Sequence, residues 1–361
     1  MEQESQTKQF DQLYKDALGL LKQLIRTQSY SGEEEGTAQL ISDFLTEQGV
    51  LFKRENNNIW AKNLHFDPDK PTILLNSHHD TVKPNKNYTN DPFDAFEREG
   101  KLFCLGSNDA GGALVSLIAT FLYFYNQKDL HYNLIIAPSA EEETTGKNGI
   151  ASILRHFGPI EFALVGEPTE MEMAVAEKAL LVLDCVAKGK PSHAAHPNKD
   201  NAIYKAMKDI QWVADYTFPK KSKWLGAVKM TTTIIKAGEL HNMVPAECHF
   251  TIDIRVTDQY STKEVYKTVQ DNLDAEVTPR SLVRDSSSID QEHPVIKAGM
   301  NLGRKCYGSP TSSDQAVIPY PSFKMGPGRS QRSHSADEFI YLHEIREGIE
   351  LYIKLLEKII H

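Results

Sequence analysis

The sequence has little that would place the protein at a membrane, on a nucleic acid or in a disulfide framework. It contains 4 cysteines among 361 residues, and none of them forms a CxxC pair. Neither a zinc knuckle nor a redox pair is therefore predicted, and reduced thiols are expected. Acidic side chains outnumber basic ones by 49 to 40, which gives a formal net charge of −9. This balance argues against a nucleic acid or an anionic membrane as partner.

Long apolar runs are also missing. The longest, residues 113–125, is interrupted by Ser116 and Thr120, and it is shorter than the roughly 20 residues that a membrane span needs. A buried helix is the better interpretation. The first six residues are acidic and polar, without the basic and apolar segments of a signal peptide, so we expect a cytoplasmic protein.

The length and the order of predicted elements indicate two domains. Strands and helices alternate up to residue 174 and again from residue 287, with predicted helices at 295–307 and 342–360. This alternation is typical of an α/β sheet with helices on its faces. Residues 175–286 show the order strand, helix, strand, strand, helix, strand, ending in a strand at 275–282, which is a split βαβ unit. We predict a domain of residues 1–174 and 287–361, into which a small α+β domain of residues 175–286 is inserted.

The most informative stretch is residues 74–82, an apolar run that ends in His78, His79 and Asp80. It predicts a buried strand followed by polar residues at the carboxyl end of a sheet. If the extended backbone continues to residue 80, His78 and Asp80 share one face. The pattern then indicates a metal ligand at His78 that Asp80 orients. The alternative is a strand end with solvated polar residues.

Further acids and a histidine follow later predicted strands and turns of the same domain. Singly, each has an ordinary explanation as a helix cap or a solvated loop. Ligands of open α/β sheets, however, gather outside the carboxyl ends of the strands, so the series in this order favours one shared site. Its members are Asp109 before a glycine-led helix, Glu141, Glu142 and Glu143 after the strand 132–137, Glu167 after the strand 162–165, and His334 after a loop rich in glycine and proline.

This series of motifs resembles the M20 family of metallopeptidases and amidohydrolases over essentially the whole chain. The resemblance implies a zinc-peptidase-like catalytic domain, with a mixed sheet flanked by helices, and an inserted ferredoxin-like lid domain. It also implies two divalent metal ions bridged by Asp109, one bound in addition by His78 and Glu167, the other by Glu143 and His334. Imidazole and carboxylate ligands suit zinc, although cobalt or manganese also fits.

The resemblance assigns the catalytic proton transfers to Glu142, the neighbour of a ligand, and the orientation of His78 to Asp80. In the inserted domain, His193 matches a histidine that is expected to donate a hydrogen bond to the developing oxyanion. In dimeric family members this histidine comes from the lid of the opposite subunit, so a homodimer through the lid domain is expected. His196 has no such match and is expected on the surface.

Two lid residues, Asn242 and Arg255, resemble family residues that hold a substrate carboxylate, a task for which an arginine fork is well shaped. For Arg255 the alternative is an ion pair with Asp253 or another lid acid. The chain also departs from the family pattern. After Asp109 the family usually has a lysine within the next residues, which the stretch 110–112 lacks. The roles of His79 and Glu141 stay open at this point.

We therefore expect a metal-dependent amidohydrolase that removes an N-acyl group, such as acetyl, from an amino acid. The overall proportions look most like the acetylornithine deacetylase branch of arginine biosynthesis, which favours N-acetylornithine or N-acetylcitrulline as the small-molecule substrate. Succinyl-diaminopimelate desuccinylation and dipeptide hydrolysis are alternatives within the same chemistry. A homologue that binds without catalysing is the non-enzymatic alternative, and it predicts a lost ligand or a lost acid/base glutamate; neither is missing.

Overall fold

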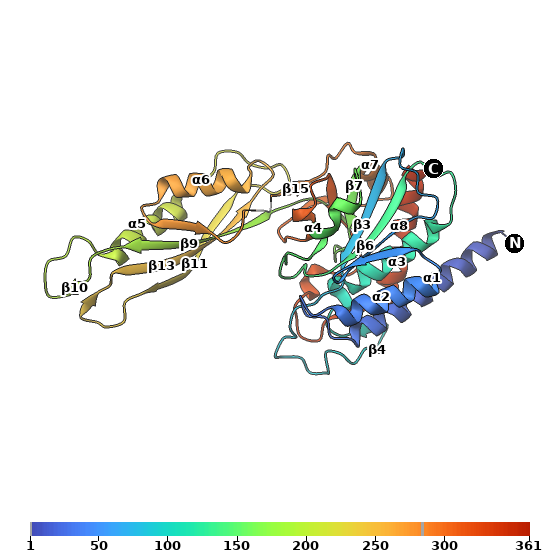
Figure 1. Cartoon of the computed structure of the whole chain (residues 1–361), viewed down its shortest axis with the longest axis horizontal. Helices are drawn as coiled ribbons and strands as arrows, with labels where there is room; N and C mark the ends of the chain where they lie inside the picture. Colours follow the sequence, from blue (N-terminus) through green and yellow to red (C-terminus); the bar gives the residue numbers. More distant parts are fainter. Residues whose placement is uncertain (1, 283–284) are drawn as a thin grey trace. The chain divides into compact units, whose positions relative to one another are not determined.

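Figure 1 shows the computed structural model of the chain, which describes residues 2–282 and 285–361. The chain divides into two compact units. The larger unit consists of Met1–Val175, Ser288–Tyr307 and Ser313–His361, and the inserted unit consists of Ala176–Ser287 and Gly308–Ser312. The short segment Gly308–Ser312 thus lies in the inserted unit, whereas the sequence pattern places it in the larger domain.

A mixed sheet forms the centre of the larger unit. The strands β6, β3, β7 and β17 run parallel to one another, while β1 pairs antiparallel with β2, β2 with β6, and β8 with β17. Every residue of β3 and β6 is buried, and because successive side chains point to opposite faces, both faces must be covered. The sheet order is β1 (Phe52–Glu55), β2 (Asn58–Lys62), β6 (Asn133–Ser139), β3 (Thr72–His78), β7 (Phe162–Val165), β17 (Ser322–Lys324), β8 (Met173–Glu177) and β15 (Ser287–Ser288), and β16 (Cys306–Ser309) pairs with β8.

Helices cover this sheet. The apolar helix α3 (Gly112–Tyr125) packs against β3 and β6 and contacts α1 (Glu2–Ile25) and α8 (Leu342–Ile360). The remaining helices of the unit are α2 (Glu35–Glu47), α4 (Ile150–Ile153) and α7 (Pro294–Asn301), with short turns η1 (Ser107–Gly111), η2 (Leu154–His156), η3 (Asp314–Val317) and η4 (Ser330–Arg332). A separate small sheet has the order β18 (Phe339–Tyr341), β5 (Lys101–Phe103), β4 (Phe96–Arg98).

The inserted unit is a four-stranded antiparallel sheet of order β11 (Lys229–Ala237), β13 (Glu247–Val256), β9 (Ala179–Lys188), β14 (Glu276–Pro279). The residues of β9 alternate between buried and half-buried, which gives the sheet one apolar face. Two helices accompany it, α5 (Ala202–Asp215), capped by Asn201, and α6 (Thr262–Asn272), which begins with a capping box of Ser261 and Glu264. A two-stranded ribbon joins β10 (Ser192–His193) to β12 (Met243–Val244). The predicted split βαβ order, and with it the fold class, is confirmed.

Two sequence predictions need correction. The helix predicted at 295–307 ends at Asn301, because Gly303 takes a left-handed φ of +80° and Cys306 already belongs to β16. The strand predicted at 275–282 is limited to β14, which ends at Pro279; proline has no N–H to extend the ladder.

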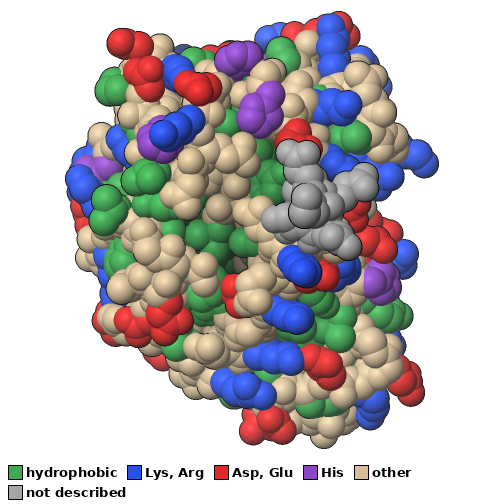
Figure 2. Space-filling model, turned by 90° about the vertical axis from the view of Figure 1, so that its right-hand side faces the viewer, with side chains coloured by type: hydrophobic (Ala, Val, Ile, Leu, Met, Phe, Trp, Pro, Cys, Tyr) green, Lys and Arg blue, Asp and Glu red, His purple; other side chains and the backbone are tan. Residues whose placement is uncertain are grey.

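Within the described part of the chain, none of the helices combines the length and the hydropathy that crossing a bilayer requires. The face of the molecule in Figure 2 carries Lys and Arg side chains interspersed with Asp and Glu.

Candidate metal centre

The candidate ligands lie where neighbouring parallel strands end. His78 is the last residue of β3, and Glu167 comes two residues after the end of β7. Glu142 and Glu143 follow the end of β6 at Ser139. Because these three strands are parallel neighbours, their carboxyl ends meet at one edge of the sheet, the usual place for a ligand in such folds.

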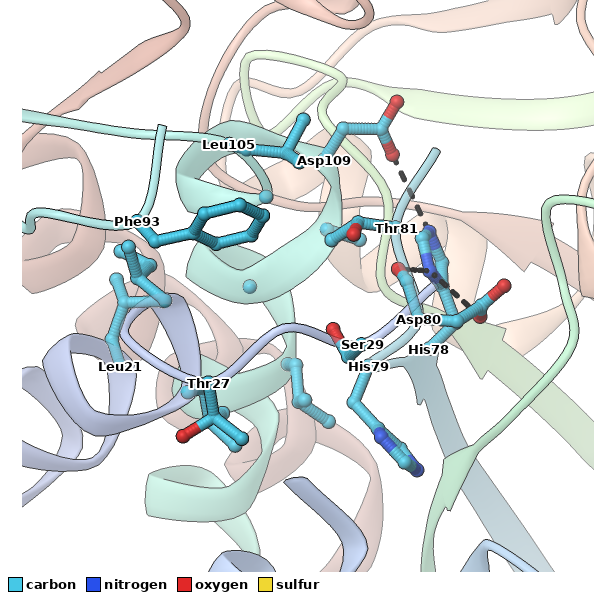
Figure 3. Close-up of a pocket in the computed structure, with 16 residues that line it drawn as sticks. Leu21, Thr27, Ser29, His78, His79, Asp80, Thr81, Phe93, Leu105 and Asp109 are labelled. Carbon is cyan, nitrogen blue, oxygen red and sulfur yellow. Dashed lines mark hydrogen bonds and ion pairs between the residues drawn. The ribbon is translucent and has the colours of Figure 1, made fainter. Parts of the chain in front are cut away.

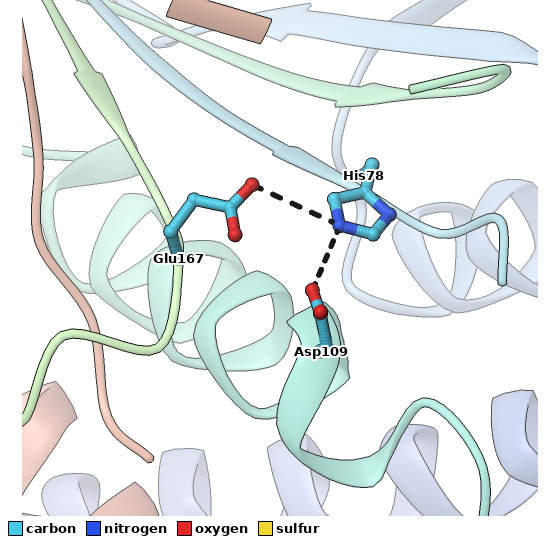
Figure 4. A group of neighbouring side chains, drawn as sticks. All are labelled: His78, Asp109 and Glu167. Carbon is cyan, nitrogen blue, oxygen red and sulfur yellow. Dashed lines mark ion pairs between the residues drawn. The ribbon is translucent and has the colours of Figure 1, made fainter. Parts of the chain in front are cut away.

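One group of possible ligands consists of His78, Asp109 and Glu167, whose nearest ligand atoms all lie within 4.8 Å of one another (Figure 4). The Nε2 atom of His78 is 3.3 Å from Oδ1 of Asp109 and 3.8 Å from Oε1 of Glu167. This nitrogen is buried and has no hydrogen-bond partner. A buried lone nitrogen facing two carboxylates leaves a place for a shared cation, so the donor set fits a metal ion.

A second group consists of Asp109, Glu143 and His334. The Nε2 atom of His334 lies 3.0 Å from Oε1 of Glu143 and 3.5 Å from Oδ2 of Asp109. The two oxygens of Asp109 thus face different histidines, Oδ1 toward His78 and Oδ2 toward His334. This is the arrangement required of a ligand that is shared between two ions.

The pKa values of the centre are shifted because several carboxyl groups lie close together in a buried place. Burial and the charge of Asp109 raise the pKa of Glu167 to about 8. Burial lowers the pKa of His78, but the carboxylates of Asp109 and Asp80 outweigh it and hold that pKa well above its ordinary value. The hydrogen bond to Glu143 raises the pKa of His334 to about 9. Positive charge is thus strongly favoured among these carboxylates.

Glu142 belongs to neither ligand group but lies beside them. Its Oε2 atom is 4.0 Å from Nε2 of His78. Burial raises the pKa of the Glu142 carboxyl well above its ordinary value. A carboxyl group with a raised pKa at the edge of a ligand cluster is suited to take up a proton and release it again, as general acid/base chemistry requires.

Asp80 has a wider role than the orientation of one ring. Nδ1 of His78 lies 3.0 Å from the main-chain oxygen of Asp80 and 3.4 Å from its Oδ1, so the closer contact is made by the backbone. An N–H on Nδ1 leaves the lone pair on Nε2 free for a ligand bond. The Asp80 carboxylate accepts the N–H groups of Glu142 and Glu143, each at 3.1 Å. Burial raises the pKa of Asp80, but His78 and Ser31 outweigh it and lower that pKa to about 2.

The structure gives His79 a supporting position away from the ligands. Its Nε2 lies 2.8 Å from the carbonyl oxygen of Asn57, and its Nδ1 lies 2.9 Å from the hydroxyl oxygen of Thr37. Burial lowers the pKa of His79 to about 4, so the ring is neutral and joins α2 to the turn between β1 and β2.

Glu141 is a supporting residue as well. Its φ of +54° lies in the left-handed region, and its carboxylate accepts hydrogen bonds from the backbone and side-chain nitrogens of Asn148 at 3.1 and 2.8 Å. The N–H of Glu141 donates to the fully buried Glu34. Together with the two bonds to Asp80, three successive amides of the loop are held by carboxylates, as in an anion-binding nest.

The loop that carries Asp109 explains the absent lysine. Gly111 stands in the middle of the stretch 110–112, and a Cβ there would collide with the carbonyl oxygen of Gly106 and lie 2.6 Å from Leu21. The packing therefore leaves no room for a side chain. Sequence reasoning missed another residue here: Glu338, which contacts the backbone of the same loop. Its position next to the apolar residues of β18 is the one sequence signal of its burial.

A narrow pocket adjoins the candidate centre (Figure 3). His78, Asp80 and Asp109 border one side of it, whereas Leu21, Phe93 and Leu105 lie toward the other. The pocket is thus lined by candidate ligand side chains on one side and by apolar side chains on the other.

The three lid residues singled out from the sequence all lie in the inserted unit. His193 is exposed on β10 and stands opposite Met243 in the ribbon, next to Asn242, whose carbonyl oxygen accepts the N–H of Ala194 at 2.9 Å. Arg255 makes a two-pronged ion pair with Asp253, with distances of 2.9 and 3.1 Å. This is the pair that the alternative interpretation of Arg255 predicts, and it weakens the assignment of Arg255 to substrate binding.

Comparison with known proteins identifies the family. The sequence pattern of the peptidase family M20/M25/M40 matches residues 74–358. The chain is 26% identical over 270 residues to succinyl-diaminopimelate desuccinylase 2 of a Ruegeria species, covering 69% of this chain and 67% of the relative. It is 24% identical over 344 residues to acetylornithine deacetylase of Buchnera aphidicola, covering 88% of this chain and 89% of that enzyme.

The fold is also that of an M20 family peptidase. A dinuclear metal-binding peptidase of the M20 family from Bacillus subtilis superposes with a TM-score of 0.75 at 15% identity, covering 96% of this chain and 98% of the other. The family resemblance and the predicted fold class are thereby confirmed. The chain belongs to peptidase family M20/M25/M40, and it is a hydrolase.

Proposed function

We propose that the protein is a metal-dependent amidohydrolase that removes an N-acyl group from an amino acid. The observation that carries this proposal is the pair of ligand groups that overlap at Asp109, with the acid Glu142 beside them. The names of two relatives, a desuccinylase and a deacetylase, describe the removal of acyl groups. An N-acetyl group on ornithine or citrulline is the substrate we favour, and a succinyl group on diaminopimelate or a dipeptide is the alternative.

Two divalent ions, zinc by preference, are the cofactors in this proposal. His78, Asp109 and Glu167 would hold one, and Asp109, Glu143 and His334 the other. Imidazole and carboxylate oxygen are ligands that zinc accepts, and cobalt or manganese would also fit them. When bound, such ions supply an activated water and polarise the carbonyl group of the amide.

The residues of the chain supply orientation and proton transfer. Glu142 would take the proton of the attacking water at its carboxylate and return it to the leaving amine. Asp80 would hold both the proton carrier Glu142 and the ligand His78 in place, because it accepts the N–H of Glu142 and contacts the ring of His78. In our proposal His193 donates a hydrogen bond to the oxyanion, and Asn242, on the same ribbon, contacts the substrate.

The substrate assignment can be tested with a panel of amides in the presence of zinc. The panel contains N-acetylornithine, N-acetylcitrulline, N-succinylornithine, N-succinyl-diaminopimelate and simple dipeptides. We expect the highest kcat/KM for an N-acetyl amino acid and the loss of that activity on chelation, with recovery when zinc is restored. Preference for the succinyl compounds or the dipeptides would replace the favoured substrate, and failure to hydrolyse any member would support the binding homologue.

We also propose a homodimer formed through the inserted unit. The strand β11 lies at the edge of its sheet and exposes Ile234 and Ile235, and the neighbouring helix α5 exposes Tyr204 and Met207. An exposed apolar edge strand is a ready site for pairing with a second copy.

The dimer proposal predicts that Ile235→Asp gives a monomer, because a buried charge in the new interface would be costly. Leu51→Asp, at an apolar residue exposed to 78% in the larger unit, should leave the dimer intact. Sedimentation velocity of both variants and of the unaltered chain measures this. An unaltered chain that sediments as a monomer at assay concentration would refute the proposal.

A further inference from the structure

Glu338 is an almost fully buried acid, 1% exposed, that lies four residues after His334. Its Oε1 atom accepts the N–H groups of Asn108 and Asp109 at 2.8 and 2.9 Å. Its own carbonyl oxygen accepts the N–H of Cys104 at 2.9 Å. Glu338 thus holds the main chain at Cys104, before η1, and at Asn108 and Asp109, within η1.

The backbone at Asp109 needs such an external partner. Although Asp109 lies in the short turn η1, its φ of −119° and ψ of 99° are not helical. A helical ladder therefore cannot hold this residue in place, and a buried N–H group must find its acceptor elsewhere. The Glu338 carboxylate is that acceptor.

The contact of Glu338 repeats the one made by Asp80. Asp80 follows the ligand His78 by two residues and accepts the consecutive N–H groups of Glu142 and Glu143. Glu338 follows His334 and accepts the consecutive N–H groups of Asn108 and Asp109. Each candidate histidine ligand is thus followed by a buried carboxylate that holds the loop of another candidate ligand.

A second connection joins the same two segments. The side chain of Asn108 donates from Nδ2 to the carbonyl oxygen of Arg329 at 3.0 Å, and its Oδ1 accepts the N–H of Arg329 at 2.9 Å. The segment that leads to His334 and the loop of Asp109 are therefore tied together by Glu338 and by Asn108. These two segments carry His334 and Asp109, whose Nε2 and Oδ2 atoms lie 3.5 Å apart.

We propose that Glu338 is a positioning residue, which holds Asp109 so that its two oxygens face the two ions. The inference rests on the proposed two-metal function. Because Asp109 belongs to both ligand groups, its displacement would weaken both metal sites together. Loss of His334 or Glu167, which belong to one group each, would weaken one site.

The test measures zinc affinity of the full chain, from which metal has been removed, by competition with a chromophoric chelator. We expect Glu338→Ala to weaken both sites by about 10–100-fold, the usual effect of losing a residue that orients a ligand. Glu338→Gln keeps one carbonyl oxygen that can accept the N–H groups of Asn108 and Asp109, so it should weaken both sites less than Glu338→Ala does. Circular dichroism establishes that each variant is folded.

Asp209 offers a matched control in the inserted unit. It is 4% exposed, and its carboxylate accepts the consecutive N–H groups of Asp274 and Ala275 at 3.1 and 3.0 Å. Asp209→Asn should therefore disturb local stability as Glu338→Gln does, but leave both zinc affinities unchanged. An equal loss of affinity in the control would show a general effect of destabilisation and overturn the proposal.

The remaining outcomes are decisive as well. Unchanged affinity at both sites, or weakening of only one site, in Glu338→Ala would contradict a role through Asp109. If Glu338→Ala does not fold, Glu338→Gln decides by the same criterion. Because zinc affinity is measured without substrate, a chain that binds two ions but hydrolyses no N-acyl amino acid would refute the proposed function while leaving the role of Glu338 standing.

Discussion

Replacing Glu142 by glutamine should lower kcat by about 10²–10⁴-fold, the usual contribution of a positioned acid/base group. The zinc content should not change, because Glu142 belongs to neither ligand group. Glutamine has nearly the same shape as glutamic acid. The backbone N–H of residue 142, which donates to Asp80 at 3.1 Å, is unchanged in the variant. The variant thus removes the proton carrier and little else. Steady-state kinetics and elemental analysis of the same preparation measure both quantities.

Glu141→Gln is the control for this experiment. The two acids are adjacent, but the Glu141 carboxylate bonds to Asn148, and one amide oxygen can retain part of that contact. Turnover in this variant should stay close to that of the unaltered chain. Full turnover in Glu142→Gln would remove Glu142 from the mechanism, and a loss of zinc would show that it acts on the ligands instead.

The ligand set could be predicted because most of its members are marked in the sequence by the element that precedes them. His78 and Glu167 follow apolar strands, and the geometry of parallel strands brings such ends together. The supporting contacts were not predictable in the same way. Glu338 and Asp80 act on backbone N–H groups, and a backbone N–H carries no sequence signal. The pairing of Arg255 with Asp253, two residues away on β13, was open to prediction and was weighed as an alternative.

Secondary-structure elements were predictable where they are long and were missed where they are short. The long helix α8 has the bounds that its clear period predicts, residues 342–360. The three-residue strands β17 and β18 were missed, because three residues are too few to show an alternation. Their formation depends on partners far away in the chain, β7 for β17 and β5 for β18. Pairing with distant strands therefore determines these short strands, for which the sequence shows no pattern.

Replacing Asp109 by alanine should remove both metal ions and abolish hydrolysis. Asp109 is the one residue common to the two groups of candidate ligands in the described chain, with Oδ1 3.3 Å from His78 and Oδ2 3.5 Å from His334. Without it, each group retains two ligands, fewer than the three protein ligands usual for a catalytic zinc site. Alanine also removes a negative charge that offsets the charge of the two ions.

His334→Ala is the informative comparison, because His334 belongs to one group only. It should lose the ion held with Glu143 and keep the ion held by His78, Asp109 and Glu167. The difference between the two variants separates a shared ligand from two independent sites.

The zinc content per chain, measured by inductively coupled plasma mass spectrometry after gel filtration, tests the shared centre most directly. We expect two ions in the unaltered chain, one in His334→Ala and none in Asp109→Ala. Asp109→Ala that keeps one or two ions while still folded would contradict the claim that Asp109 joins two metal sites.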